Sequence, residues 1–321
     1  MCQPWRVTDG SKKAIIAAFF ANLGIAIAKF IGFLITRSAS MLAESVHSFA
    51  DTGNQGLLIL GGNRAKRDAT PEHPFGFGRE RYFWSFSVAL VLFSMGGLFA
   101  LYEGISKVRN PHHIDSIWVA VGILVFGLLL EGYSLRTAVR EAKLIKAEGV
   151  SWWKFIRKSK QPELPVVLLE DLGAELGLGF ALFGVIMAKQ TDDGRWDAIG
   201  SIAIGVLLIA IAIVLMIEMK GLLIGESATP KDRASIVSAI EGSDKVDHLI
   251  HLRTQHIGPD EILVAAKVEY DSSLTFDELS ATINLTEANI RAVVPAARLI
   301  FVEPDLRRPE TETDTNTGTE H

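Results

Sequence analysis

Residues 199–217 read IGSIAIGVLLIAIAIVLMI, a run of 19 residues without a charged side chain. An α-helix needs about 20 mostly apolar residues to cross the hydrocarbon layer of a bilayer. Four other stretches approach the same length and character, at 14–35, 83–101, 117–133 and 165–187. So many long apolar stretches argue against buried core helices of a water-soluble protein, and they predict a polytopic α-helical membrane protein.

A sixth candidate, residues 41–62, is weaker because Glu44, His47 and Asp51 interrupt its apolar pattern. We still predict a span, since the segment follows a clear one and ends in the apolar run 56–62. An even number of spans places both termini on one side of the membrane. The loops on that side hold 16 Lys and Arg residues and the opposite loops hold 5, which predicts that both termini are cytoplasmic.

The location of the predicted multi-pass protein is less constrained. Residues 1–10 are polar and carry neither a signal-peptide nor a transit-peptide pattern. A plasma (inner) membrane of the bacterial type is the simplest expectation.

Charge divides the chain into two parts. The 321 residues hold 32 Lys and Arg against 37 Asp and Glu, a net charge of −5, which gives no electrostatic reason to bind nucleic acid. The only cysteine is Cys2, so a disulfide framework and a Cys-based zinc cluster are both excluded. Residues 1–225 carry a net charge of +4 and residues 226–321 a net charge of −9. We predict a six-helix transmembrane domain over 1–225, a cytoplasmic α+β domain over 226–304 and a disordered acidic tail over 305–321.

The predicted cytoplasmic domain has a readable order of elements. A helix follows the start signal Thr229-Pro230, and alternating apolar patterns indicate strands. The expected elements are a helix at 234–240, strands at 248–255 and 262–270, a helix at 276–294 and a strand at 298–302. This α-β-β-α-β order predicts a small ferredoxin-like α+β sandwich.

Ionisable residues inside spans are costly and mark ion paths or binding sites. His47 and Asp51 are four residues apart, so they share one helix face, and imidazole with carboxylate is a common ligand pair for zinc and similar ions. Glu170, Asp171 and Glu175 lie in a later span. The plainer alternative is that some of these acids reach the membrane interface or pair with a lysine.

That lysine is Lys29 in the first span. Glu131, near the end of the fourth span, could help to release ions or could simply reach water. Asn54 and Gln55 could form hydrogen bonds between helices, which is the commoner role of amides in membranes.

Two segments resemble the cation diffusion facilitator family. Residues 38–55, SASMLAESVHSFADTGNQ, resemble the second span of that family, and residues 73–80, HPFGFGRE, resemble its following loop. The resemblance covers about residues 11–304. It implies six spans, cytoplasmic termini and a cytoplasmic domain similar to small metal chaperones.

The resemblance also implies a function. Members export divalent metal, most often zinc, usually in exchange for protons, and they form homodimers in the lipid bilayer. Their transport site takes two ligands from the second span and two from the fifth. Three of those positions correspond here to His47, Asp51 and Asp171. At the fourth, where the family has a second histidine, this chain has Val167. Glu170 is the candidate replacement, with Glu175 as the other possibility.

The replacement of a histidine by a carboxylate bears on the choice of metal. Carboxylate oxygen suits manganese or ferrous iron better than imidazole nitrogen does. Zinc remains the first expectation on resemblance alone, with manganese, iron or cobalt behind it. The ion is the transported substrate, and no cofactor is expected.

The secondary metal sites of the family look incomplete. Asp68 and His73 could bind an ion, but another position where some members carry histidine is Phe77. In the cytoplasmic domain His248 and His251 are expected to face opposite sides of a strand. The domain is therefore expected to stabilise the dimer rather than to hold a complete zinc site.

Two other classes of function compete with transport. A membrane-embedded metallohydrolase would use the same carboxylates, but the sequence lacks H-E-x-x-H, P-loop and G-x-S-x-G patterns, so no enzyme is expected. A non-transporting, metal-responsive membrane protein stays open because of Val167.

Overall fold

A computed structural model describes residues 9–111, 116–146 and 149–307. The chain forms two compact units, Met1–Leu223 and Ile224–His321, and each is described here by itself. Most of the tail that the sequence predicts over 305–321 lies outside the described residues, which end at 307.

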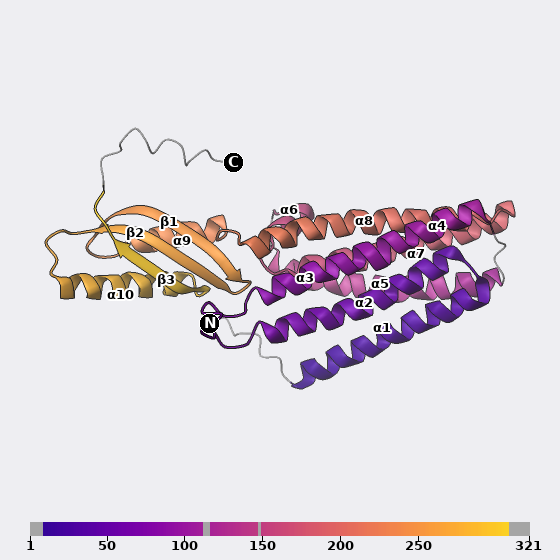
Figure 1. The fold of residues 1–321 in the computed structure, drawn as a ribbon, viewed down its shortest axis with the longest axis horizontal. Helices are drawn as coiled ribbons and strands as arrows, with labels where there is room; N and C mark the ends of the chain where they lie inside the picture. The colour runs from indigo at the N-terminus through magenta and orange to yellow at the C-terminus, as the bar shows by residue number, and fades with distance from the viewer. Residues whose placement is uncertain (1–8, 112–115, 147–148, 308–321) are drawn as a thin grey trace. The chain divides into compact units, whose positions relative to one another are not determined.

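The first unit is a bundle of long helices that run side by side (Figure 1). Helices of 26–30 residues are about 40–45 Å long, enough to cross a hydrocarbon layer of about 30 Å. One of the six rods is composite, because α3 continues through the π-helical turn η1 into α4. The rods are α1 (Asp9–Thr36), α2 (Ala39–Arg64), α3 (Glu80–Val91) with η1 (Leu92–Leu98) and α4 (Phe99–Arg109), α5 (Ile117–Ile145), α7 (Glu163–Thr191) and α8 (Arg195–Ile224). The predicted polytopic helical class is confirmed.

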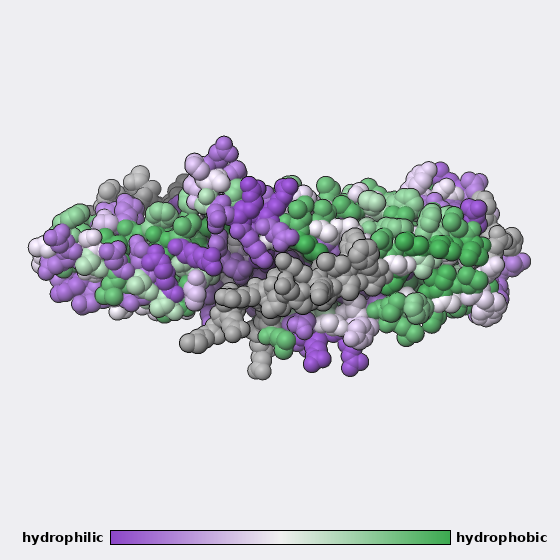
Figure 2. All heavy atoms as spheres, turned by 90° about the horizontal axis from the view of Figure 1, so that it is seen from below, coloured by the Kyte–Doolittle hydropathy of each residue, from purple (hydrophilic) through white to green (hydrophobic). Residues whose placement is uncertain are grey.

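Apolar side chains cover the outside of this bundle. Figure 2 shows a broad hydrophobic band over the helices on the face turned to the viewer. Examples are Phe30 on α1, Phe126 and Leu129 on α5, and Ile213 on α8, each at least 40% exposed. Among the described residues, three rods are long and apolar enough to span a membrane by composition alone: 80–109, 117–144 and 195–224. The predicted site residues lie on two other rods, α2 and α7.

Glycines bring the third rod and α8 into close contact. A Cβ on Gly205 would lie 2.6 Å from the backbone nitrogen of Leu101, and one on Gly97 would lie 2.6 Å from a side-chain carbon of Ile209. The Ser201 hydroxyl donates a hydrogen bond of 2.8 Å to the Ala100 carbonyl across the same interface. Small residues let helix backbones approach in this way inside a membrane, where van der Waals packing drives association.

The C-terminal end of α5 differs from the sequence prediction. We expected the apolar helix to end at Tyr133 and residues 136–160 to form a loop, but α5 continues to Ile145. The extension is rich in Ala, Leu, Arg, Lys and Glu, which favour helix in water, so the charges end the apolar stretch without ending the helix. A short helix, α6 (Trp152–Lys158), follows and was not predicted.

The second unit confirms the predicted α-β-β-α-β order. Its elements are α9 (Pro230–Glu241), β1 (Val246–Gly258), β2 (Glu261–Tyr270), α10 (Phe276–Val293) and β3 (Ala297–Pro304). The sheet order is β1-β2-β3, with β1 antiparallel and β3 parallel to β2. Alternate residues of β2, among them Val264 and Val268, pack with Ile236, Ile240 and Ile290 of the helices in one apolar core.

A capping box begins α10. The Thr275 hydroxyl accepts from the Glu278 backbone N–H, and the Glu278 carboxylate accepts from the Thr275 backbone N–H at 2.8 Å. The hydrogen bond from this N–H holds the pKa of Glu278 below its usual value. The exchange satisfies two donors that would otherwise be left open at the helix start.

The expectation that His248 and His251 face opposite sides of the sheet is wrong. His248 pairs with Glu269 and His251 pairs with Lys267, and a β-bulge between Leu249 and His251 takes up the extra residue. Partners two residues apart on β2 share one face, so both histidines lie on that face. His251 also accepts a hydrogen bond of 2.8 Å from Arg253, whose positive charge disfavours a metal ion there.

The contact of α8 with the third rod can be tested at Gly205. Gly205→Ala is expected to lower the free energy of unfolding by about 1–3 kcal/mol, because the new methyl would overlap backbone atoms of the third rod. Gly179→Ala is the matched control, since a Cβ there meets nothing within 4 Å. The measurement is the thermal midpoint of the purified protein in detergent. Equal midpoints for the two variants would contradict this account.

Candidate metal-binding site in the helical bundle

Helix α2 carries a polar face toward its neighbours. Glu44, His47, Ser48, Asp51 and Asn54 follow one another at spacings of three, one, three and three residues, which keeps them on one side of the helix. Four of them are buried, and Asp51 is largely buried. A helix that crosses a membrane with such a face must find partners for it inside the bundle.

His47 and Asp51 form the pair that the sequence predicts. The His47 Nε2 lies 3.4 Å from the Asp51 Oδ2, and the imidazole is fully buried. The His47 Nδ1 and the Asp51 Oδ1 have no hydrogen-bond partner among the described residues. A neutral imidazole nitrogen and a carboxylate oxygen, both without other bonds, are the donor types that zinc and related ions take.

Helix α7 brings its two adjacent acids to different neighbours. The Asn54 amide on α2 donates a hydrogen bond of 2.6 Å to the buried Glu170 carboxylate. The Asp171 carboxylate accepts from the Ser134 hydroxyl of α5 at 3.0 Å. Glu170 therefore faces α2, whereas Asp171 faces α5.

The four predicted ligands, His47, Asp51, Glu170 and Asp171, therefore do not meet at one point in this structure. In the described part of the chain, no group of three or more His, Cys, Asp or Glu side chains is gathered tightly enough to hold a metal ion. The geometry brings His47 to Asp51 directly and brings Glu170 to α2 through Asn54. Val167, the residue at the family's second histidine position, is half-buried one turn before Asp171.

A buried lysine stands beside the pair. The Lys29 Nζ on α1 lies 3.2 Å from the Glu44 carboxylate and donates a hydrogen bond of 2.8 Å to the Ser48 hydroxyl. It also lies 3.9 Å from the Glu131 carboxylate of α5. Lys29 is 1% exposed and Glu44 is fully buried. The sequence alternative in which Lys29 pairs with the acids of α7 is therefore wrong. The charge of Lys29 is balanced by Glu44 of α2 and Glu131 of α5, and Glu44 lies one helical turn before His47.

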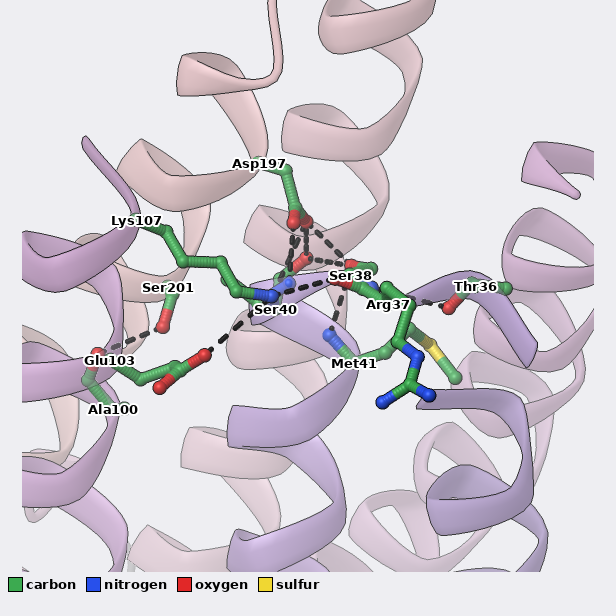
Figure 3. Close-up of polar contacts among 11 residues, drawn as sticks. Thr36, Arg37, Ser38, Ser40, Met41, Ala100, Glu103, Lys107, Asp197 and Ser201 are labelled. Atoms are coloured by element: carbon green, nitrogen blue, oxygen red, sulfur yellow. Dashed lines mark hydrogen bonds and ion pairs between the residues drawn. The ribbon is translucent and has the colours of Figure 1, made fainter. Parts of the chain in front are cut away.

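A buried carboxylate fixes the start of α2. Figure 3 shows Asp197, in the first turn of α8, surrounded by the residues that open α2. Asp197 accepts from the Ser38 hydroxyl at 2.6 Å, from the Ala39 backbone N–H at 2.5 Å, and from both the N–H and the hydroxyl of Ser40. The Ser38 hydroxyl in turn accepts from the Met41 N–H at 3.2 Å as the N-cap. One side chain thus satisfies several of the donors that a helix start leaves open.

The same end of α2 is also joined to α4. The Lys107 Nζ donates a hydrogen bond of 2.6 Å to the carbonyl of Arg37, the residue before Ser38 (Figure 3). The same Nζ forms an ion pair of 3.6 Å with the Glu103 carboxylate. Arg37 has a φ of +56°, a left-handed conformation that few side chains adopt without support. Sequence reasoning missed Asp197 and Lys107, because their partners lie far away along the chain.

The predicted secondary site lies in the loop after α2. The ring of His73 stacks on Phe77 with 4.6 Å between centroids, and the Arg67 guanidinium lies 4.5 Å from the Phe77 centroid. Thr70 and His73 also close a small antiparallel bridge. A metal site at Asp68 and His73 stays a prediction.

Comparison with known proteins identifies the family. The cation efflux transmembrane domain matches residues 15–224. The chain therefore belongs to the cation efflux family, the cation diffusion facilitators, and the resemblance of residues 38–55 and 73–80 is confirmed. This is a family of transporters, which agrees with the expectation that the chain is not an enzyme.

Named relatives span several kingdoms. The mitochondrial proton-coupled zinc antiporter SLC30A9 of Homo sapiens is 31% identical over 263 residues, which is 82% of this chain and 46% of that protein. Metal tolerance protein C4 of Arabidopsis thaliana is 28% identical, over 82% of this chain and 58% of its own length. The chain thus spans about half the length of these relatives.

A magnetosome protein and a solved domain of MamM are also similar to this chain. Magnetosome protein MamB of Paramagnetospirillum magneticum is 23% identical, over 92% of this chain and 95% of its own length. A solved C-terminal domain of MamM matches 25% of this chain and 94% of its own length at 22% identity. Its TM-score of 0.23 is too low to bear on the fold.

The buried lysine gives the first test of the site. Lys29→Met is expected to lower the free energy of unfolding by about 3–5 kcal/mol, because Glu44 is left buried without its cation. The double variant Lys29→Met/Glu44→Leu removes both charges and is expected to recover most of that loss. Thermal midpoints in detergent measure both effects. A double variant less stable than Lys29→Met would contradict the pairing.

The Asp197 contacts give a second test. Asp197→Ala leaves buried hydroxyl and N–H donors of α2 without an acceptor, at about 1–3 kcal/mol for each donor that water does not reach. We expect a lower thermal midpoint and faster hydrogen exchange in the first turn of α2. Asp247→Ala, at an exposed position of β1, serves as the control. Unchanged exchange in Asp197→Ala would show that α2 does not depend on this carboxylate.

Proposed function

We propose that this chain is a secondary transporter that exports a divalent metal ion from the cytoplasm in exchange for protons. The observation that carries the proposal is the buried pair of His47 and Asp51, whose Nδ1 and Oδ1 atoms have no partner in the described chain. The pair lies on a helix of a bundle with a lipid-facing apolar surface, where an ionisable residue needs a functional reason. The human relative SLC30A9 is named as a proton-coupled zinc antiporter, which supports the same proposal.

Competition between protons and metal supplies the coupling. Metal ligands must be deprotonated, so His47, Asp51 and the acids of α7 bind either protons or the ion. The metal enters from the cytoplasmic side, the bundle changes to face outward, and protons then displace the ion. This alternating access needs no separate proton path.

Zinc is the first candidate among the metals. A set of one imidazole with Asp51, Glu170 and Asp171 is rich in carboxylate, which also suits manganese, ferrous iron or cobalt. Glu170 takes the role of the family's second histidine in this proposal, because among the described residues it is the α7 acid that a side chain of α2 binds.

The membrane and the assembly complete the proposal. We place both termini in the cytoplasm on the charge asymmetry of the loops, and we take a plasma (inner) membrane as the simplest location for the protein. The C-terminal unit serves as the contact of a homodimer, a role suggested by the family.

Metal flux in proteoliposomes tests the function. With an imposed pH gradient, the wild-type protein is expected to move zinc toward the more acidic compartment. Asp51→Ala is expected to reduce that flux at least about tenfold, since it removes a ligand. Asp247→Ala, an exposed residue of β1, is the matched control.

The panel of ions then decides the substrate. Zinc, manganese, iron and cobalt are compared under the same gradient, and the fastest flux names the physiological class of ion. Folded protein that moves none of them would contradict the transport proposal and favour a metal-responsive role.

A further inference from the structure

Asn54 is held in one orientation between two helices. It is fully buried on α2, and its Nδ2 donates a hydrogen bond of 2.6 Å to the Glu170 Oε1 on α7. An ionised carboxylate can only accept, so Asn54 must present its NH₂ group to Glu170 and turn its oxygen the other way. The Asn54 Oδ1 has no hydrogen-bond partner among the described residues.

A buried carbonyl oxygen without a partner is unusual. Leaving such a group unsatisfied costs about 1–3 kcal/mol, and native structures keep few of them without a reason. An interhelical bond to Glu170 explains the NH₂ end of Asn54 but leaves the oxygen unexplained. The oxygen therefore indicates a second interaction, with a group that is positively charged or donates a hydrogen bond.

The position of Asn54 identifies that group. Asn54 follows Asp51 by three residues and His47 by seven, so all three lie on one face of α2. The free Asp51 Oδ1 belongs to a residue one turn before Asn54, whereas the free His47 Nδ1 lies near Gly96 of η1. The amide oxygen of Asn54 and the carboxylate of Asp51 are both donors that a divalent cation takes, and Glu170 adds a second carboxylate from α7.

We propose that Asn54 is a metal ligand of the ion-loaded transporter and binds the cation through its carboxamide oxygen, beside Asp51 and Glu170. This inference rests on the proposed transport function and adds a residue that determines its specificity. It also accounts for the shortage of donors, because the His, Asp and Glu side chains in the described chain form no group of three.

The chemistry of the oxygen predicts a preference. A neutral amide oxygen is a hard ligand, of the kind that manganese and magnesium accept readily, whereas zinc relies more on nitrogen and sulfur. Asn54 should therefore matter more for Mn²⁺ than for Zn²⁺. Loss of its oxygen should shift the balance of the site toward zinc.

Equilibrium binding to the full chain in detergent tests the assignment without requiring transport. The probes are Zn²⁺ and Mn²⁺ alone, and the variants are Asn54→Leu and Asn54→Asp, with Gln55→Leu as the matched control on the same helix. Asn54→Leu is expected to weaken Mn²⁺ binding at least about tenfold, and Zn²⁺ binding by less. Gln55→Leu is expected to bind both ions as the wild-type protein does.

Asn54→Asp separates a ligand from a residue that only positions Glu170. Aspartate keeps an oxygen for the metal but cannot donate to the Glu170 carboxylate. If Asn54 is a ligand, Asn54→Asp keeps its Mn²⁺ affinity closer to wild type than to Asn54→Leu. If it loses binding as fully as Asn54→Leu does, the NH₂ group is what matters and the proposal is overturned.

A spectroscopic measurement distinguishes a lost metal ligand from a variant that is only less stable. The visible absorption of bound Co²⁺ depends on the number and type of its ligands, so it should change in Asn54→Leu and stay unchanged in Gln55→Leu. Altered thermal midpoints with wild-type spectra and affinities would overturn the proposal in favour of a structural bond. Wild-type binding with no flux would refute transport while leaving the role of Asn54 intact.

Discussion

A charge inside a hydrocarbon layer needs a partner, and this constraint organises the helical bundle. Lys29 on α1 reaches Glu44 and Ser48 on α2 and approaches Glu131 on α5, so one buried ammonium joins three helices. Replacing such a pair with apolar residues can be neutral, but removing one member is strongly destabilising. The arrangement therefore holds the central turns of α2 in one register. His47 lies between two residues that Lys29 contacts, and its orientation depends on that register.

The start and the middle of α2 are held by different neighbours. Asp197 of α8 binds the first turn of α2, and the close approach of α8 to the third rod at Gly205 joins those two rods in turn. Near its middle, α2 is joined to α7 by the hydrogen bond from Asn54 to Glu170. A proton or a metal ion that reaches Glu170 changes this bond directly. The contact between α2 and α7 is thus the part of the bundle whose strength depends on what the site holds.

Local pattern predicted the helices and the His47–Asp51 pair, because apolar length and i, i+4 spacing are properties of a short segment. It could not predict which acid Lys29 would meet or that Asp197 would bind Ser38, 159 residues away. Those contacts depend on how the helices pack. The face shared by His248 and His251 was missed for another reason, since a β-bulge breaks the strict alternation on which strand patterns rely. The extension of α5 did have a local signal, in the strong helix formers that follow Tyr133.

The central claim is that α2 and α7 together bind the transported ion. The most direct measurement is anomalous scattering at the zinc absorption edge from crystals of the zinc-loaded protein, which locates the ion without assuming its ligands. The account predicts a zinc ion bonded to the His47 imidazole at about 2.0–2.1 Å and to the Asp51 carboxylate, with Glu170 on the opposite side. Zinc held only by the Asp68–His73 loop or by the histidines of β1, with His47 and Asp51 unbound, would contradict it.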